Sequence, residues 1–128
     1  MRIKQTQHAS RAVAFALSAL VCGQAFAQES PPPYISARVD SVLFSADDRW
    51  GGCMALLSED PQTVRPSCAS GWVTFSCTGD FTDRVRAYRM ADQAQLALAT
   101  GNRVFVMIDE NKKHNGYCFA SRIDVYAW

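Results

Sequence analysis

The feature that most constrains this chain is a long helical stretch that runs directly into a strand, between residues 80 and 109. Apolar residues recur there at helical spacing and form a single stripe, which consists of Ala87, Ala91, Ala94 and Leu98. Thr82 and Asp83 stand where an N-cap belongs. Gly101 can adopt the left-handed conformation that ends a helix. The stretch therefore predicts one helix that buries an alanine face.

After Gly101 the apolar period changes from 3.6 residues to two. One face of this alternating segment consists of Val104, Val106 and Ile108, and the other of Arg103, Phe105 and Met107. The pattern predicts a half-buried strand over residues 103–108, with the valine and isoleucine side chains facing the core.

Four further segments have the composition of short strands, at residues 34–44, 53–57, 72–77 and 117–128. Residues 109–116 form a predicted polar turn that ends in Asn115-Gly116, a strong hairpin signal. The order is three strands, one helix and two strands. This order favours a mainly β, α+β domain built as a five-stranded OB-like barrel with the helix between the third and fourth strands. The alternative is an open α+β sheet with the helix across one face.

The first 27 residues have the pattern of a secretory signal peptide. A basic start precedes an uncharged apolar run at residues 12–21, and residues 25–27 (A-F-A) form a small-x-small cleavage site. The apolar run is shorter than the about 20 residues that a membrane anchor needs. We therefore expect a secreted or periplasmic chain, with a proline-rich leader at residues 28–33 and one domain at residues 34–128.

Charge and hydropathy exclude two classes of partner. All 12 acidic residues follow residue 27, whereas three of the 13 basic residues precede it, so the exported part has a small acidic excess. A nucleic-acid-binding domain would need a basic excess. No second apolar run is long enough to predict a membrane span.

Four of the five cysteines lie after the predicted cleavage site, at Cys53, Cys68, Cys77 and Cys118. An even number of cysteines in a short exported chain predicts two disulfides. Three pairings are possible, and the spacing alone does not choose among them. A zinc site is disfavoured because the cysteines lack paired C-x-x-C spacing.

The sequence lacks a recognisable catalytic constellation, phosphate-binding loop or dinucleotide motif. His114 is the one histidine after the signal segment, and its polar neighbours predict a solvated turn residue. The acidic pairs at residues 47–48, 59–60 and 109–110 fall in predicted loops. We therefore expect a non-catalytic chain with no cofactor and no bound metal. A small hydrolase that uses Asp47, Asp48 and His114 is the catalytic alternative.

The passage from the helix to the following strand resembles the binding (B) subunits of AB5 toxins, in the branch of subtilase cytotoxin and the pertussis-like typhoid toxin. The resemblance rests on Asp92-Gln93-Ala94, Thr100-Gly101 and the strand residues Val104, Val106 and Ile108. Residues 34–36 (Y-I-S) are similar to the first strand of that branch, where a serine contacts sialic acid. Cys53 and Cys77 fall where the branch has a disulfide between its second and third strands.

The resemblance implies an OB-fold, lectin-like subunit that binds a sialylated glycan and assembles as a homo-pentamer with an exported enzymatic (A) subunit. It implies that Ser36 binds the ligand and that Cys53 bonds to Cys77. Tyr34, in the same short segment as Ser36, is a second ligand-binding candidate. Cys68 and Cys118, which have no counterparts in the branch, are then left for each other. Further candidates for stacking on sugar rings are Trp50, Trp72, Tyr117, Tyr126 and Trp128.

Both ends of the chain depart from that branch. Residues 30–33 (S-P-P-P) replace its W-T-G-D start, and its C-terminal cysteine hairpin is missing. These departures favour a second hypothesis, in which the same fold serves as a stand-alone periplasmic or secreted interaction or inhibitor protein.

Overall fold

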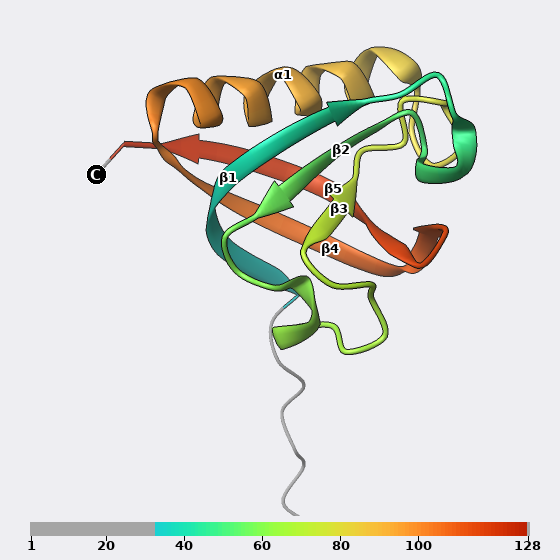
Figure 1. Ribbon diagram of the computed structural model, residues 1–128, viewed down its shortest axis with the longest axis horizontal. Helices are drawn as coiled ribbons and strands as arrows, with labels where there is room; N and C mark the ends of the chain where they lie inside the picture. Colours follow the sequence, from blue (N-terminus) through green and yellow to red (C-terminus); the bar gives the residue numbers. More distant parts are fainter. Residues whose placement is uncertain (1–32, 128) are drawn as a thin grey trace, which may run out of the picture.

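The computed structural model describes residues 33–127, and these form a closed five-stranded barrel with one helix (Figure 1). The strands are β1 (Tyr34–Phe44), β2 (Cys53–Leu57), β3 (Trp72–Thr74), β4 (Arg103–His114) and β5 (Tyr117–Tyr126), in the barrel order β1-β2-β3-β5-β4. β3 pairs with β5 in parallel, and the other pairs are antiparallel. The predicted OB-like barrel is confirmed, and the open sheet is excluded.

Three sequence-based predictions fall outside the described residues. These are the signal peptide, most of the proline-rich leader and Trp128. Within residues 33–127, no helix is both long enough and apolar enough to cross a membrane.

Among residues 33–127 the one long helix, α1 (Arg84–Thr100), lies between β3 and β4 in sequence and packs against the barrel above β1 and β5 (Figure 1). Asp83 caps its first turn by accepting a hydrogen bond from the backbone N–H of Arg86 at 3.0 Å. Gly101 follows the helix with φ of 71°, as the sequence predicted. The predicted N-cap residue and the predicted C-terminal glycine therefore mark the two ends of α1.

The buried face of α1 consists of Ala87, Ala91, Ala94 and Ala97. The prediction of Leu98 in this stripe was wrong, because Leu98 is 42% exposed and Ala97 is 1% exposed. Alanines 91, 94 and 97 follow one another at intervals of three residues. Since three residues fall short of a full 3.6-residue turn, the line of contact drifts around the helix and leaves Leu98 at its edge.

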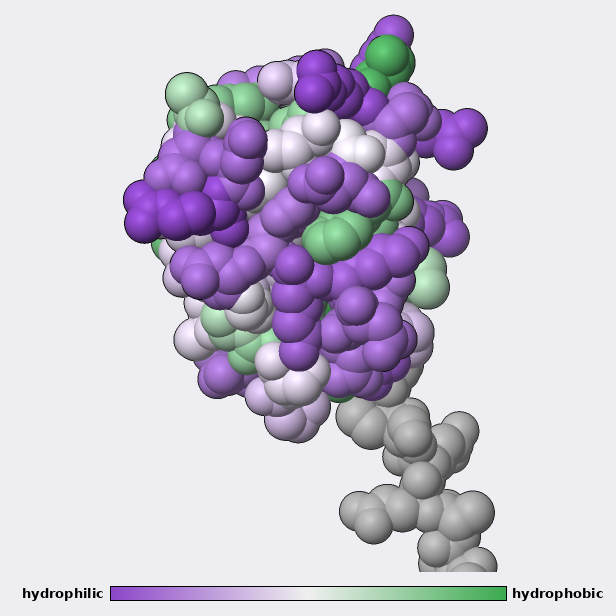
Figure 2. All heavy atoms as spheres, turned by 90° about the vertical axis from the view of Figure 1, so that its right-hand side faces the viewer, coloured by the Kyte–Doolittle hydropathy of each residue, from purple (hydrophilic) through white to green (hydrophobic). Residues whose placement is uncertain are grey.

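Branched and aromatic side chains from the strands, and from Phe75 directly after β3, fill the barrel interior. The larger of these are Ile35, Val39, Leu57, Val73, Phe75, Val104, Val106, Ile108 and Ile123. Outside the barrel, the side with the 3₁₀ helix η1 (Asp48–Trp50) and the β4–β5 turn is mostly hydrophilic and has only small, separate hydrophobic patches (Figure 2). Apolar area is thus concentrated inside, as the alternation of the strands requires.

β1 contains a bulge that reverses which of its residues face outward. Val39 pairs with Leu57 and Ser41 with Leu56, so Asp40 is an extra residue on β1. Ile35, Ala37 and Val39 face the core before the bulge, whereas Val42 packs against the core after it. Even-numbered residues therefore face outward at the start of β1 and odd-numbered residues at its end.

The β4–β5 hairpin is longer than predicted. β4 continues to His114, and only Asn115 and Gly116 form the turn, with φ of 49° and 86°. These positive φ values are those of the tight hairpin turn that the Asn-Gly pair predicted. Residues 110–112 form a bulge between the pairs Asp109–Phe119 and Lys113–Cys118, which explains why this polar segment looked like a turn.

β3 is shorter than the predicted strand at residues 72–77. Ser76 has φ of 59°, in the left-handed region, so the strand ends at Thr74. The backbone N–H of Ser76 donates a hydrogen bond to the Thr74 side-chain hydroxyl at 3.1 Å. This local bond replaces the strand pairing that the alternation had predicted.

Two disulfides cross-link the barrel, and both have the predicted pairing: the first is the one that the resemblance implied, and the second joins the two cysteines that it left over. Cys53–Cys77 joins β2 to the segment after β3, and Cys68–Cys118 joins the loop at residues 58–71 to β5, with Cα–Cα distances of 5.5 and 5.4 Å. Stable disulfides form in oxidising compartments, so the cross-links indicate an extracytoplasmic protein.

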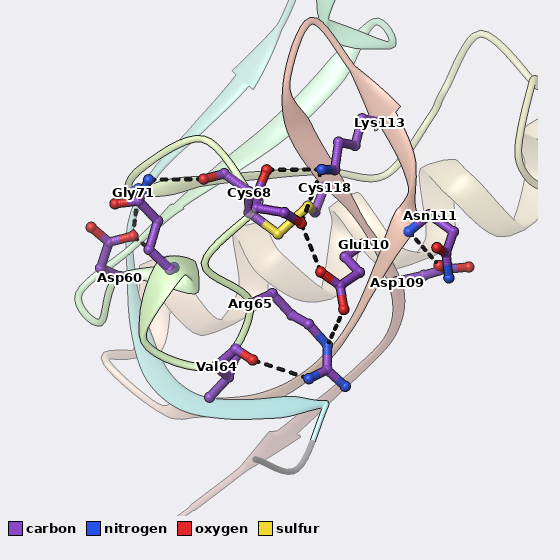
Figure 3. The surroundings of a disulfide bond; sticks show 12 residues. Asp60, Val64, Arg65, Cys68, Gly71, Asp109, Glu110, Asn111, Lys113 and Cys118 are labelled. Atoms are coloured by element: carbon purple, nitrogen blue, oxygen red, sulfur yellow. Dashed lines mark hydrogen bonds and ion pairs between the residues drawn. A yellow bond between two sulfur atoms is a disulfide. The ribbon is translucent and has the colours of Figure 1, made fainter. Parts of the chain in front are cut away.

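The loop at residues 58–71 is also held by charged groups around the second disulfide (Figure 3). Glu110, in the β4 bulge, accepts a hydrogen bond from Ser67 at 2.7 Å and pairs with the Arg65 guanidinium at 3.5 Å. Lys113 donates to the Ser67 carbonyl at 2.8 Å. The loop at residues 58–71 is therefore held against the β4 bulge by these contacts.

Removal of the Cys68–Cys118 bond should destabilise the fold. The bond closes a loop of 50 residues, and in the chain-entropy model it lowers the free energy of the native state relative to the unfolded state by about 4 kcal/mol. We expect the C68A/C118A double variant to lose free energy of unfolding of this order in a guanidinium titration. An unchanged unfolding midpoint would contradict the prediction.

Candidate functional site

Nine outward-facing residues on β1, β4 and β5 form a continuous surface, which we call the β1–β4–β5 face. Strand register places them in three rows across the strands. The rows are Tyr34, Met107 and Arg122; Ser36, Phe105 and Asp124; and Arg38, Arg103 and Tyr126. The face thus gathers side chains from both ends of the sequence.

A polar network occupies the corner of this face that the sequence singled out through Ser36. The Ser36 and Tyr126 hydroxyls lie 2.5 Å apart, although 90 residues separate them in the chain. The Arg103 guanidinium donates to the Ser36 carbonyl at 2.8 Å and to the Ser36 hydroxyl at 3.2 Å. A serine, a phenol and a guanidinium therefore meet at one half-buried point.

The network also alters the acidity of Tyr126. The hydrogen bond with Ser36, and then the hydrogen bond and positive charge of Arg103, lower the pKa of the Tyr126 phenol below its usual value. Burial opposes this shift but does not cancel it. The site thus favours negative charge on an oxygen atom placed between Ser36 and Arg103.

Tyr34, the second predicted ligand-binding residue, lies beside this network. It is 42% exposed and faces outward on β1, two residues before Ser36. Its ring stacks on Phe105 with centroids 4.5 Å apart and an interplanar angle of 29°. We call this stacked pair of Tyr34 and Phe105 the aromatic ledge. It lies next to the network of Ser36, Arg103 and Tyr126, which we call the polar corner.

Positive charge predominates on the β1–β4–β5 face. Arg38, Arg103 and Arg122 share it with one acidic residue, Asp124, which pairs with Arg122 at 2.8 Å. The residues after the predicted signal segment have an acidic excess, so this positive charge is a local feature. Such a surface attracts anions.

A separate pocket contains three of the aromatic residues that the sequence nominated. Trp50, Trp72 and Tyr117 line a cavity of about 200 Å³ together with Leu43 and Met54. None of these residues belongs to the β1–β4–β5 face. The predicted aromatic candidates are therefore divided between two places, since Tyr126 lies in the polar network.

His114 is not the solvated turn residue that the sequence predicted. It ends β4, and its side chain is only 12% exposed. Its Nε2 atom lies 3.0 Å from the Ser76 hydroxyl and 3.6 Å from an Asp80 carboxylate oxygen, and its ring packs on Phe81. The histidine therefore holds the segment after β3 against β4.

The Ser76, His114 and Asp80 cluster does not have the geometry of a catalytic triad. In a triad the acid binds the histidine nitrogen that faces away from the serine. Here both partners contact Nε2. Ser76 is also fully buried, and its hydroxyl accepts a hydrogen bond from the backbone N–H of Phe81 at 3.2 Å.

The acidic pairs in the loops have local structural partners. Asp47 caps η1 and pairs with Arg49, which lowers the pKa of Asp47. Asp60 caps the 3₁₀ helix η2 (Pro61–Thr63) and accepts a hydrogen bond from Ser70 at 2.6 Å, which lowers the pKa of Asp60. Among residues 33–127, no group of three or more histidine, cysteine or acidic residues could hold a metal ion.

The described residues thus define a small, disulfide-linked barrel consistent with an OB-like fold, an architecture that binds oligonucleotides and oligosaccharides in other proteins. Comparisons of this chain with models of protein families, with curated proteins and with solved structures find no match.

The sequence nominated Ser36, Tyr34 and Tyr126 separately but did not predict that Ser36, Tyr126 and Arg103 meet. The outward position of Arg103 and Phe105 on a strand was evident from the alternation at residues 103–108. The pairing of Ser36 with Phe105 and of Arg103 with Tyr126 depends on strand register, which the alternation does not determine.

The effect of the polar network on Tyr126 can be measured directly. The S36A variant loses the hydrogen bond that stabilises the phenolate, so we expect the pKa of Tyr126 to rise toward its usual value. Ultraviolet difference titration should show one tyrosine that ionises at higher pH in S36A than in the parent. The Y126F variant identifies that step, and identical titrations of parent and S36A would refute the assignment.

Proposed function

We propose that this chain is a non-catalytic, glycan-binding protein whose β1–β4–β5 face binds a sugar that bears a carboxylate. The observation behind the proposal is the convergence of Ser36, Tyr126 and Arg103 at one half-buried corner of that face. These groups supply two hydroxyls and a guanidinium, which is the set of donors that suits a carboxylate with neighbouring hydroxyl groups.

The aromatic ledge supplies the second half of sugar recognition. A sugar ring has an apolar face of C–H groups and a periphery of hydroxyl groups. Tyr34 and Phe105 offer ring surface for the apolar face, next to the polar corner. The local excess of arginine on the β1–β4–β5 face favours an anionic sugar over a neutral one.

The resemblance to AB5 toxin B subunits supports the same proposal. Ser36 matches the position of the serine that contacts sialic acid in that branch, and the barrel and the Cys53–Cys77 bond agree with the fold that the resemblance implies. Under this proposal the exported chain forms a ring of five copies that delivers an enzymatic subunit.

The outward side of α1 favours an interface with another protein chain. Val85, Tyr88, Leu96 and Leu98 are large apolar residues with exposed side chains. A contiguous exposed apolar patch marks a protein interaction surface, and we infer that these four residues contribute to one. They suit a ring of like subunits, and they equally suit the second candidate function, a stand-alone periplasmic or secreted interaction or inhibitor protein.

Glycan binding can be tested with a glycan array and the purified exported chain. We expect acidic glycans to bind, and we expect S36A and R103Q to bind them at least tenfold more weakly, because each loses a hydrogen bond to a charged group. R86A, which alters an exposed helix arginine outside the face, is the matched control. A folded parent that binds no glycan, or an S36A variant with parental affinity, would reject the proposal.

The oligomeric state separates the two candidate functions. Native mass spectrometry of the exported chain should show five copies if it forms a ring. We expect a charged residue in place of Leu96, as in L96E, to dissociate the ring without loss of the fold, because Leu96 is exposed on α1. A strictly monomeric parent would favour the stand-alone interaction protein.

A further inference from the structure

The pocket lined by Trp50, Trp72, Tyr117, Leu43 and Met54, which we call the aromatic pocket, lies on the outside of the barrel. Strand pairing places Leu43 opposite Met54 and Met54 opposite Thr74, and Thr74 lies beside Phe119 in the parallel β3–β5 pair. Trp72 lies two residues before Thr74, and Tyr117 lies two residues before Phe119. Both side chains therefore face outward and are neighbours across β3 and β5. Met54 is 3% exposed and forms the floor.

Trp50 completes the pocket from η1, and several contacts fix its position. Its carbonyl accepts a hydrogen bond from the Thr74 hydroxyl at 2.9 Å. Gly51 follows with φ of 76°, and a side chain there would meet His114 and Thr74 at 2.5 Å. The backbone at Trp50 and Gly51 is thus packed closely against Thr74 and His114 beside the pocket.

Size and chemistry restrict the ligand. A cavity of about 200 Å³ is smaller than the about 300 Å³ at which sites for drug-sized molecules begin, so it accepts a small group. Its lining residues offer few polar atoms, namely two indole N–H groups and one phenol. A sugar or a primary ammonium would lose several hydrogen bonds to water and recover few of them.

A quaternary ammonium group suits this lining. It has no N–H to satisfy, it is apolar on its surface, and its positive charge is attracted to aromatic faces. The Trp50 ring already attracts one cation, since the Arg49 guanidinium lies 5.0 Å from its centroid. Asp47 pairs with Arg49 through a hydrogen bond of 2.7 Å and so offsets its charge near the pocket.

We propose that Trp50, Trp72 and Tyr117 form an aromatic cage for a small quaternary ammonium group, such as the trimethylammonium group of choline. This site shares no residue with the β1–β4–β5 face, so it does not depend on the glycan-binding proposal. The same trimethylammonium chemistry occurs in free choline compounds and in phosphatidylcholine headgroups, and the experiment distinguishes these sources.

The test is a fluorescence titration of the W128F variant with choline chloride. The chain has three tryptophans, so this variant leaves Trp50 and Trp72 as the reporters. We expect a saturable change with choline. We expect at least about fivefold weaker binding of the neutral alcohol in which a tert-butyl group replaces trimethylammonium, since only the charged form gains the cation–π attraction.

Variants locate the site and separate it from the glycan surface. Trp50→Leu and Trp72→Leu should each weaken choline binding at least about tenfold, measured by magnetisation transfer to the choline methyl groups. Ser36→Ala should bind choline like the parent. Trp50→Leu should bind acidic glycans like the parent if these are bound at all. Circular dichroism confirms that each variant is folded, and Trp50→Leu, in the short helix η1, serves alone if Trp72→Leu does not fold.

Three outcomes would overturn the inference. These are no saturable binding of choline by the folded chain, equal affinity for choline and its neutral analogue, and a choline affinity that Trp50→Leu leaves unchanged. Co-sedimentation with phosphatidylcholine vesicles but not phosphatidylglycerol vesicles, abolished by Trp50→Leu, identifies the lipid headgroup as the source. Choline binding without co-sedimentation identifies free choline compounds.

Discussion

Close packing between the alanine face of α1 and the barrel is the constraint on which the rest of the structure depends. Alanine loses no side-chain rotamer freedom on burial and lets the helix backbone approach the strands. Because Gly101 ends α1 and β4 starts at Arg103, the position of the helix on the barrel determines where β4 begins. The position of Arg103 beside Ser36 therefore follows from an apolar contact on another part of the domain.

The sequence predicted the helix and the strands because each of them has a local signal of its own, but it left an open sheet as an alternative to the barrel. The alanine spacing, the Asp83 cap and the Gly101 stop predicted α1, and alternation predicted the interior residues of β4. The Asn115-Gly116 pair predicted the hairpin turn. The order of the elements then favoured a barrel, since a helix between the third and fourth strands suits one of its ends.

The errors arose where contacts between distant segments override local preference. A polar environment in sequence suggested that His114 is solvated, yet its ring is covered by Phe81 and bonded to Ser76. The alternation at residues 72–77 suggested a longer strand, yet Ser76 leaves the extended conformation. Neither partner of His114 could be identified without knowing that the segment after β3 crosses the end of β4.

The candidate site shows the same division between local and distant information. Ser36 was predicted through a resemblance of the first strand and Tyr34 as its neighbour in that segment. The outward position of Arg103 was predicted from the two-residue alternation at residues 103–108. The meeting of Ser36 with Tyr126 was not, because a shift of one residue in strand register moves a side chain to the opposite face. The sequence therefore pointed to Ser36, Tyr126 and Arg103 one by one, but it did not predict the hydrogen bonds between them.

The extra residue at Asp40 determines how β1 serves two different surfaces. The strand offers Ser36 to the polar corner and, after the change of parity, Leu43 to the aromatic pocket. Seven residues of extended chain place these two side chains on the order of 20 Å apart. One compact molecule is too short to reach both. Under the two proposals made above, occupancy of both places at once requires two ligands, or one long ligand with an acidic end and a cationic end.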